Sequence, residues 1–174
     1  EKNTLTITGI ASGKTVKYLS GGRSEGAAGG AVNNTVNLVG TGAGTLEEVY
    51  GGYIGKTTNS ANATGNTVNI AGGTVAKNIY AGYTNGTGKT TGNTVNLGSA
   101  ANAVASGTTI TGTIYGGSKA VATNNTLNVY DSATAGNIAN FDQINFKATS
   151  SHITVGDTLL TLNDGNATNL DWNK

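Results

Sequence analysis

Three polar residues near the C-terminus are of the types that form a hydrolase triad. His152 is the only histidine of the chain, Ser151 precedes it and Asp157 follows it. In a triad the histidine takes the serine proton while the carboxylate orients the imidazole, so the three side chains must meet. Ser151 and His152 are sequence neighbours, however, and neighbouring side chains of a strand point to opposite faces. The sequence therefore predicts that His152 is a surface or packing residue and not a catalytic one.

A Gly-Lys-Thr triplet, which ends many phosphate-binding loops, occurs three times. Such a loop also needs a glycine five positions before the Gly-Lys pair, because successive backbone N–H groups cradle the phosphates. Those positions hold Thr8, Tyr50 and Tyr83. We therefore expect solvated loops that carry lysines, and no nucleotide site. The triplets are Gly13-Lys14-Thr15, Gly55-Lys56-Thr57 and Gly88-Lys89-Thr90.

Acidic residues are sparse in the first 130 residues. Glycoside hydrolysis needs two carboxylates about 5 to 9.5 Å apart, and the repeats offer only Glu25, Glu47 and Glu48. Glu25 shares a loop with Arg23, and we expect the two to form a solvated ion pair. Calcium-binding β-rolls repeat Asp among their glycines, whereas no Asp precedes Tyr130 here. We predict no catalytic residue, no metal and no cofactor; a carbohydrate-active β-helix enzyme is the alternative.

The composition excludes several classes of protein. Of the 174 residues, 28 are glycine, none is proline or cysteine, 11% are charged, and the net charge is +1. This charge argues against nucleic acid as a partner. A transmembrane helix would need a run of about 20 apolar residues, which the sequence lacks, and a disulfide framework would need cysteines. A repetitive β-structure and a disordered polar tract are the two classes left.

Two short motifs recur along the chain. The first is a pentapeptide that starts with Asn and alternates polar with apolar residues, and its five copies start 31, 32, 27 and 32 residues apart. The second places a tyrosine between an apolar residue and a glycine-containing pair. Alternation is the period of a half-buried strand and argues against disorder. The pentapeptides are Asn3–Ile7, Asn34–Leu38, Asn66–Ile70, Asn93–Leu97 and Asn125–Val129; the second motifs are Val49–Gly52, Ile79–Gly82 and Ile114–Gly117, with Leu19–Gly22 as a weaker copy.

A single repeat cannot bury its own apolar stripe, so the repeats are expected to stack as a β-solenoid of about five rungs. Strands would lie about 4.8 Å apart, with Val68 between Val36 and Val95. Glycine suits corners with positive φ or close backbone approach, and the lack of proline keeps each N–H available to the neighbouring rung. The first Asn of each pentapeptide is expected to form a corner ladder of side-chain amides. Its members are Asn34, Asn66, Asn93 and Asn125.

Tyrosines recur at two positions of the repeat. Tyr50, Tyr80 and Tyr115 share the first position, and we predict that they form a structural stack through offset aromatic contacts. Tyr53 and Tyr83 follow three residues later. They are the candidate binding residues, because an outward aromatic stripe suits contact with a sugar or a protein. Membership of a structural ladder is the equally open alternative for these two.

Beyond Tyr130 the period fails, and both phenylalanines of the chain follow. Gly156-Asp157 lies between two alternating runs, a pattern typical of a type II′ hairpin. Because a stack needs an element over its last apolar rung, we predict a C-terminal hairpin cap. The chain is thus divided into solenoid repeats (1–138) and a capping segment with its tail (139–174). Since residue 1 is not Met, we expect a piece of a longer protein.

The repeats resemble those of bacterial autotransporter-type surface proteins. The likeness rests on runs such as Tyr50–Tyr53 and Gly65–Ile70, and near the end on Asn140–Phe146 and Gly156–Leu160. It spans nearly the whole chain. The resemblance implies a right-handed parallel β-helix that is exported to the bacterial cell surface and tethered to the outer membrane in the full-length protein.

Together these patterns predict an all-β, single-stranded parallel β-helix that works as a non-enzymatic extracellular adhesin or stalk. Polar and aromatic contacts along the repetitive face would attach it to a protein or glycan of a host or bacterial cell surface. Self-association through the same face is a further expectation. We expect neither nucleic acid binding nor membrane insertion of this chain.

Overall fold

The computed structural model describes residues 2–101, 103–104, 108–118, 122–148, 150–151 and 153–164, and its strands form three parallel sheets. No helix long and apolar enough to cross a membrane occurs in these ranges. The six-stranded sheet contains β1 (Thr4–Ile7), β4 (Thr35–Leu38), β7 (Thr67–Ile70), β11 (Thr94–Leu97), β13 (Thr126–Val129) and β15 (Gln143–Phe146). The seven-stranded sheet contains β2 (Thr15–Ser24), β5 (Thr45–Ile54), β8 (Thr74–Val75), β9 (Ile79–Thr84), β12 (Thr109–Gly117), β14 (Ala133–Ala139) and β16 (Leu160–Leu162). The three-stranded sheet contains β3 (Ala31–Val32), β6 (Ala63–Thr64) and β10 (Thr90–Thr91).

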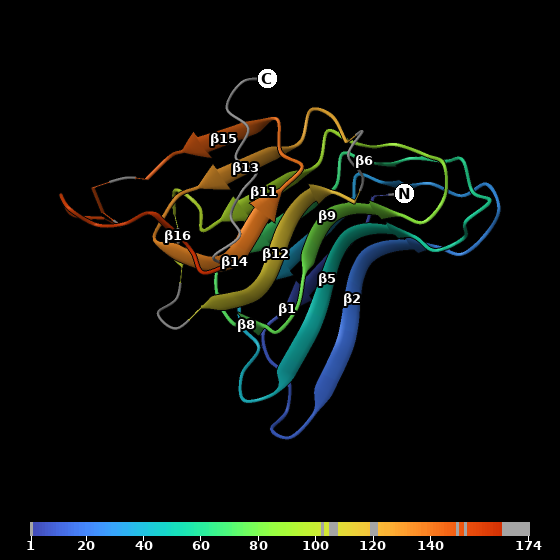
Figure 1. Cartoon of the computed structure of the whole chain (residues 1–174). Helices are drawn as coiled ribbons and strands as arrows, with labels where there is room; N and C mark the ends of the chain where they lie inside the picture. Colours follow the sequence, from blue (N-terminus) through green and yellow to red (C-terminus); the bar gives the residue numbers. More distant parts are fainter. Residues whose placement is uncertain are drawn as a thin grey trace.

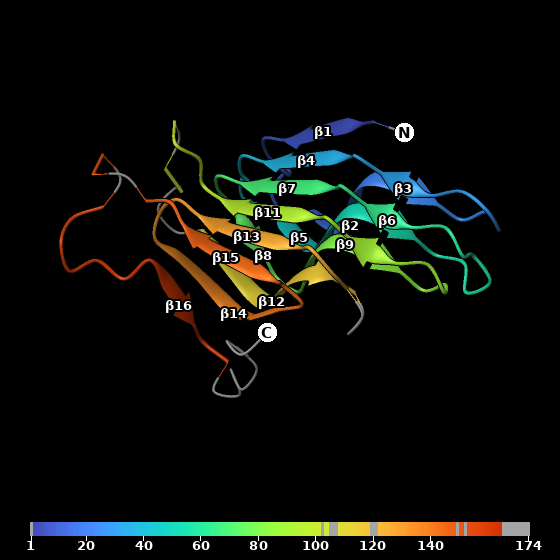
Figure 2. The ribbon, with the colours of Figure 1, turned by 90° about the horizontal axis from the view of Figure 1, so that it is seen from above.

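The chain winds through the three sheets in a fixed order. One turn runs from β3 through β4 and β5 to β6, which stacks in parallel on β3 and starts the next turn. Figure 2 shows the strands of the six-stranded sheet lying one after another in chain order, from β1 to β15. The predicted all-β parallel β-solenoid of about five turns is therefore confirmed. The right-handed winding stays a prediction.

Apolar side chains stack in register inside the coil. Val68 pairs with Val36 on one side and with Val95 on the other, as the alternation predicted. All three are fully buried. Burial of one such side chain contributes roughly 1.5–3 kcal/mol relative to leaving it exposed. Each inner rung is therefore stabilised by its contacts with the rungs on both sides. From the seven-stranded sheet, the residues Leu46, Val49, Val75, Ile79, Ile110 and Ile114 belong to the same core.

The corner between the three-stranded and the six-stranded sheet requires a left-handed residue. Asn33, Gly65, Gly92 and Asn124 occupy this repeat position, with φ angles between +56° and +65°. Gly and, less often, Asn adopt this conformation at low cost. Each of these corners turns the chain so that the following Asn points into the coil.

The two sequence motifs fit together in space. A Cβ built on Gly52, in the second motif, would lie 2.5 Å from Nδ2 of Asn66, which opens the next pentapeptide. Only glycine leaves room for the amide at this position, so the glycine of one motif and the asparagine of the other form one unit. The equivalent pairs are Gly22 with Asn34 and Gly82 with Asn93, whereas Gly117, the register partner of Gly82, meets Thr90 and Ala122 instead.

The C-terminal segment continues the coil, and the predicted hairpin is wrong. β15 pairs in parallel with β13, and β16 pairs in parallel with β14 (Figure 1). A turn does form at Gly156, where the Asp157 N–H donates to the Thr154 carbonyl at 3.2 Å. The alternation of apolar residues is the same in parallel and antiparallel strands, and parallel pairing sets Ile144 beside Leu127, which extends the core row. The division between solenoid and capping segment at residue 138 stays a prediction.

Candidate functional site

The four predicted ladder asparagines form one row inside the coil. Asn34 donates from its backbone N–H and its Nδ2 to Asn66 Oδ1 at 3.0 and 2.9 Å. Asn66 donates in the same way to Asn93, and Asn93 to Asn125, over distances of 2.9 to 3.1 Å. None of the four is more than 1% exposed. This inner ladder is thus closed to any ligand, and its function is structural.

The inner ladder has two further members that the sequence prediction did not include. Asn3 donates from Nδ2 to Asn34 Oδ1 at 3.0 Å and opens the row. Asp142 Oδ2 accepts the backbone N–H of Asn125 at 3.0 Å. A carboxylate accepts hydrogen bonds but has no N–H to donate, so the row of donated bonds ends at Asp142.

The tyrosines at the first repeat position stack on the outer side of the seven-stranded sheet. The ring centroids of Tyr50 and Tyr80 lie 5.3 Å apart, and those of Tyr80 and Tyr115 lie 4.7 Å apart, with interplanar angles of 6° and 5°. Tyr50 is only 7% exposed. Each tyrosine is in register with the next along the stacked strands, so the structure brings the three rings together as a ladder.

Tyr53 and Tyr83 form a second stack beside the first. Their centroids are 5.1 Å apart, and both rings meet Tyr50 edge to face at 4.9 and 5.3 Å. The curvature of β5 (Figure 1) explains why residues three apart lie on one face, which a straight strand does not allow. The guanidinium of Arg23 covers Tyr53 at 4.5 Å. Both faces of the Tyr53 ring are therefore in contact with protein, and a ligand would meet mainly ring edges and hydroxyls; the binding role of the pair stays a prediction.

Burial changes the acidity of this tyrosine cluster. It raises the pKa of Tyr80 and Tyr83 above the ordinary range. Burial also raises the pKa of Tyr50, and the hydrogen bond from its hydroxyl to Glu48 (2.7 Å) adds to the effect. Tyr50, Tyr80 and Tyr83 are accordingly neutral throughout the physiological range.

A second amide ladder runs along the outer face of the six-stranded sheet. Asn145 donates from Nδ2 to Asn128 Oδ1, and the row continues through Asn96 and Asn69 to Asn37 over distances of 2.7 to 2.9 Å. Sequence analysis missed this outer ladder, because an asparagine at an outward alternating position resembles any solvent-facing residue. The sequence feature that could have indicated this ladder is the asparagine that recurs as the fourth residue of four pentapeptides. Nδ2 of Asn37 ends the row on Thr6 Oγ1 at 3.3 Å.

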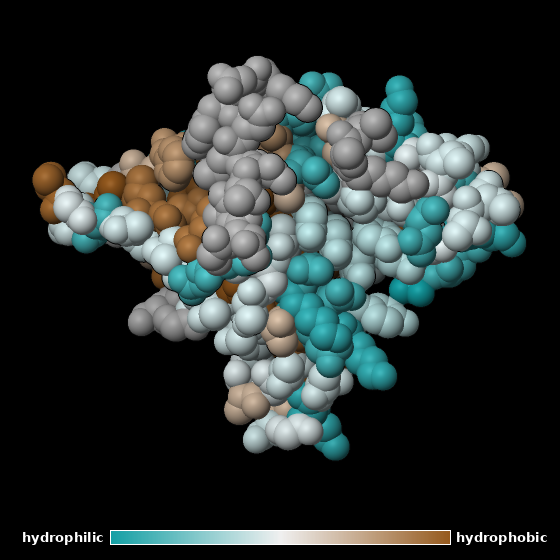
Figure 3. Space-filling model, viewed as in Figure 1, coloured by the Kyte–Doolittle hydropathy of each residue, from teal (hydrophilic) through white to brown (hydrophobic). Residues whose placement is uncertain are grey.

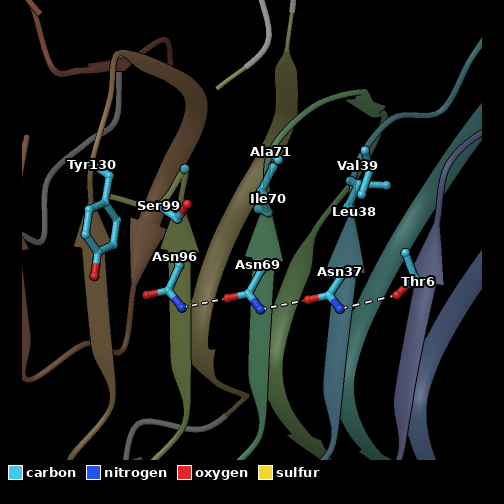
Figure 4. A pocket seen from close by; sticks show the side chains of 11 residues that line it. Thr6, Asn37, Leu38, Val39, Asn69, Ile70, Ala71, Asn96, Ser99 and Tyr130 are labelled. Atoms are coloured by element: carbon cyan, nitrogen blue, oxygen red, sulfur yellow. Dashed lines mark hydrogen bonds between the residues drawn. The ribbon is translucent and has the colours of Figure 1, made fainter. Parts of the chain in front are cut away.

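Part of the outer ladder forms the floor of a groove of about 390 Å³. Figure 4 shows Asn96, Asn69 and Asn37 side by side on three neighbouring strands, with Tyr130 at one end of the row and Thr6 at the other. Val39, which is 50% exposed, also lines the groove. The residues that line the groove are all uncharged. The groove therefore combines fixed amides with apolar and aromatic surface, which suits binding and lacks the carboxylates that hydrolysis requires.

The remaining candidate residues do not assemble a reactive site in the described ranges. No three His, Cys, Asp or Glu side chains there are grouped to hold a metal ion. His152 lies outside the described residues. Arg23 and Glu25 form the expected ion pair, with side chains 38% and 54% exposed. The lysines of the three Gly-Lys-Thr triplets are exposed: Lys14, Lys56 and Lys89.

The surface divides by polarity. Figure 3 shows hydrophilic colours over β2 and β5, while apolar colour gathers beside β15, β16 and the loop that joins them. Phe146 and Val155 are among the exposed apolar side chains of this end. The groove lies on the six-stranded sheet, so it is separate from the hydrophilic surface over β2 and β5 of the seven-stranded sheet.

No family model, curated protein or solved structure matches this chain. Its geometry alone defines the class to which it belongs, a parallel β-solenoid repeat protein. Within that class the chain is characterised by an inner and an outer amide ladder, a five-ring tyrosine cluster and an uncharged groove.

Proposed function

We propose that this chain is a non-enzymatic adhesive or stalk segment of a bacterial cell-surface protein. The observation that carries the proposal is the outer amide ladder, which repeats the same polar group on successive turns of one sheet face. Repetition suits attachment, because many weak contacts along one face add up by avidity. The proposed partner is a surface protein or glycan of a host or bacterial cell, and self-association through the same face is the second mode.

The architecture supports this function mechanically. Hydrogen bonds between backbones link each described turn to its neighbours, and the inner ladder adds side-chain bonds in the same direction. Such a stack is rigid along its axis, so contacts on the outer face stay in a fixed spacing. A stalk needs this stiffness, and an adhesive face needs the constant spacing.

Attachment of coated beads tests the proposal. Beads carrying the purified chain are expected to clump or to adhere to bacterial or epithelial cells. A variant with Asn37→Lys and Asn96→Lys adds two charges to the outer face and is expected to lose most of this adhesion. The matched control, Thr57→Lys with Thr87→Lys, adds the same charge to exposed loop positions and is expected to keep it. Beads that adhere to nothing and do not clump, or a face variant that behaves like the loop control, would contradict the proposal.

A further inference from the structure

We propose that the groove over Asn37, Asn69 and Asn96 binds an uncharged linear polysaccharide that lies along the solenoid axis. The inference rests on the proposed adhesive function and assigns it a ligand class and a site.

The floor offers a donor and an acceptor on each rung. Asn69 uses one N–H for Asn37 and one oxygen lone pair for Asn96, at 2.8 and 2.7 Å. An amide has two N–H groups and two acceptor sites, so one of each is left for a ligand. Asn37 and Asn96 have the same arrangement, and all three side chains are half-buried. Sugar hydroxyls, which both donate and accept, match this pattern.

The spacing of the floor fits a repeating ligand. Asn37, Asn69 and Asn96 are direct register partners on adjacent strands, which lie about 4.8 Å apart. A β-linked pyranose unit is about as long as this spacing, so successive sugars meet equivalent amides. Tyr130, at the β13 end of the row (Figure 4), provides a half-buried ring for contact with a sugar face.

The position of the groove disfavours an extended peptide as the ligand. Peptides bind sheets mainly by adding a strand to a free edge, where unpaired N–H and C=O groups are available. The groove lies instead on the face of β4, β7 and β11, each of which has a paired neighbour on both sides. The lining residues are uncharged, which favours a neutral glycan over an acidic one along the amide floor; a cation, Lys147, lies beside the Tyr130 end, with its ammonium 5.7 Å from the centroid of that ring.

Titration of the whole chain with chitohexaose and cellohexaose, followed by calorimetry and by the NMR signals of the side-chain amides, tests the inference. At least one hexasaccharide is expected to bind and to shift the amide signals of Asn37, Asn69 and Asn96. Asn69→Ala and Tyr130→Ala are each expected to weaken binding about tenfold, which corresponds to the loss of one or two hydrogen bonds or of a ring contact. Tyr130→Phe keeps the ring and is expected to retain most of the affinity.

Thr67→Ala is the matched control for Asn69→Ala. It truncates the neighbouring outward residue of β7, which does not line the groove, and it is expected to change affinity less than about twofold, as a residue without ligand contacts should. Circular dichroism and thermal melts of each variant separate loss of binding from loss of fold.

The results distinguish failure of the inference from failure of the proposed function. Equal effects of Asn69→Ala and Thr67→Ala would overturn the groove as the site, and so would binding of extended peptides without any hexasaccharide binding. If beads adhere to cells or clump while neither hexasaccharide binds, the inference is overturned and the adhesive function stands. Absence of both adhesion and binding overturns the two together.

Discussion

Asn66→Ala provides the sharpest test of what holds the coil together. The Asn66 side chain takes part in four hydrogen bonds: it accepts two from Asn34, and it donates to the Ala31 carbonyl and to Asn93 Oδ1. Truncation removes all four and leaves two N–H groups of Asn34 without an acceptor. Asn34 is only 1% exposed, so water cannot replace the lost partner.

The expected cost follows from these unpaired groups. Each buried donor left unsatisfied costs about 1–3 kcal/mol, so Asn66→Ala is expected to lower the free energy of unfolding by about 3–5 kcal/mol. A domain of this size is stable by only about 5–15 kcal/mol, and the variant is therefore expected to be near its stability limit.

Asn69→Ala is the matched control, because it removes an asparagine of the same pentapeptide from the outer ladder. Its two ladder bonds lie on a half-exposed face, where water can take the place of the partner. We expect a loss below about 1 kcal/mol. Urea denaturation followed by circular dichroism measures both values. If the free energies of unfolding of the two variants differ by less than about 0.5 kcal/mol, the smallest net contribution expected of one hydrogen bond, the structural importance assigned to the inner ladder is refuted.

Three further experiments test the contact between Gly52 and Asn66, the end of the inner ladder at Asp142 and the burial of the tyrosines. Gly52→Ala would set a methyl group against the Asn66 amide and is expected to lower the denaturation midpoint, whereas Gly26→Ala, with open space around it, is expected to leave it unchanged. Asp142→Asn keeps an acceptor for Asn125 and is expected to be nearly neutral, while Asp142→Ala removes it and is expected to cost about 1 kcal/mol in the same assay. Because burial raises the pKa of Tyr80 and Tyr83, the folded chain keeps protons that the unfolded chain releases near pH 10. The corresponding stability is intact below about pH 10 and is lost as the pH rises through the folded pKa; ultraviolet titration of tyrosinate in native and denatured protein checks this, and superimposable curves would contradict it.

The stacking of the repeats could be predicted from the sequence because it depends on local, repeated features. The alternation around Val68 sets which side chains enter the core, and a residue that recurs at one repeat position must lie over its own copies. The same reasoning predicted the inner ladder at Asn66 and Asn93, and it predicted in general terms that glycine occupies corners with positive φ, as Gly65 and Gly92 do.

Features that depend on three-dimensional context were not predictable in this way. The outward alternation of Asn69 gives no sign of whether its amide bonds to a neighbour or to water, and this decides whether an outer ladder exists. The hairpin expected around Gly156 failed because a turn signal does not specify what the flanking runs pair with: residues 153–155 form no strand, and β16 pairs in parallel with β14. The contact of Tyr53 with Tyr50 depends on the bend of β5, which the spacing of three residues does not indicate.

The two ladders donate in opposite directions, and this bears on the groove. In the inner row Asn66 donates toward the C-terminal neighbour Asn93, whereas in the outer row Asn96 donates toward the N-terminal neighbour Asn69. Within a row no single amide can flip, because flipping Asn69 would set its oxygen against that of Asn37 and its NH₂ against that of Asn96. The orientation of the groove floor is thus determined before any ligand arrives. A ligand that matches this orientation binds with little further loss of side-chain entropy, because the amides are already ordered. A row of asparagines, although flexible as isolated side chains, is for this reason suited to act as an adhesive surface.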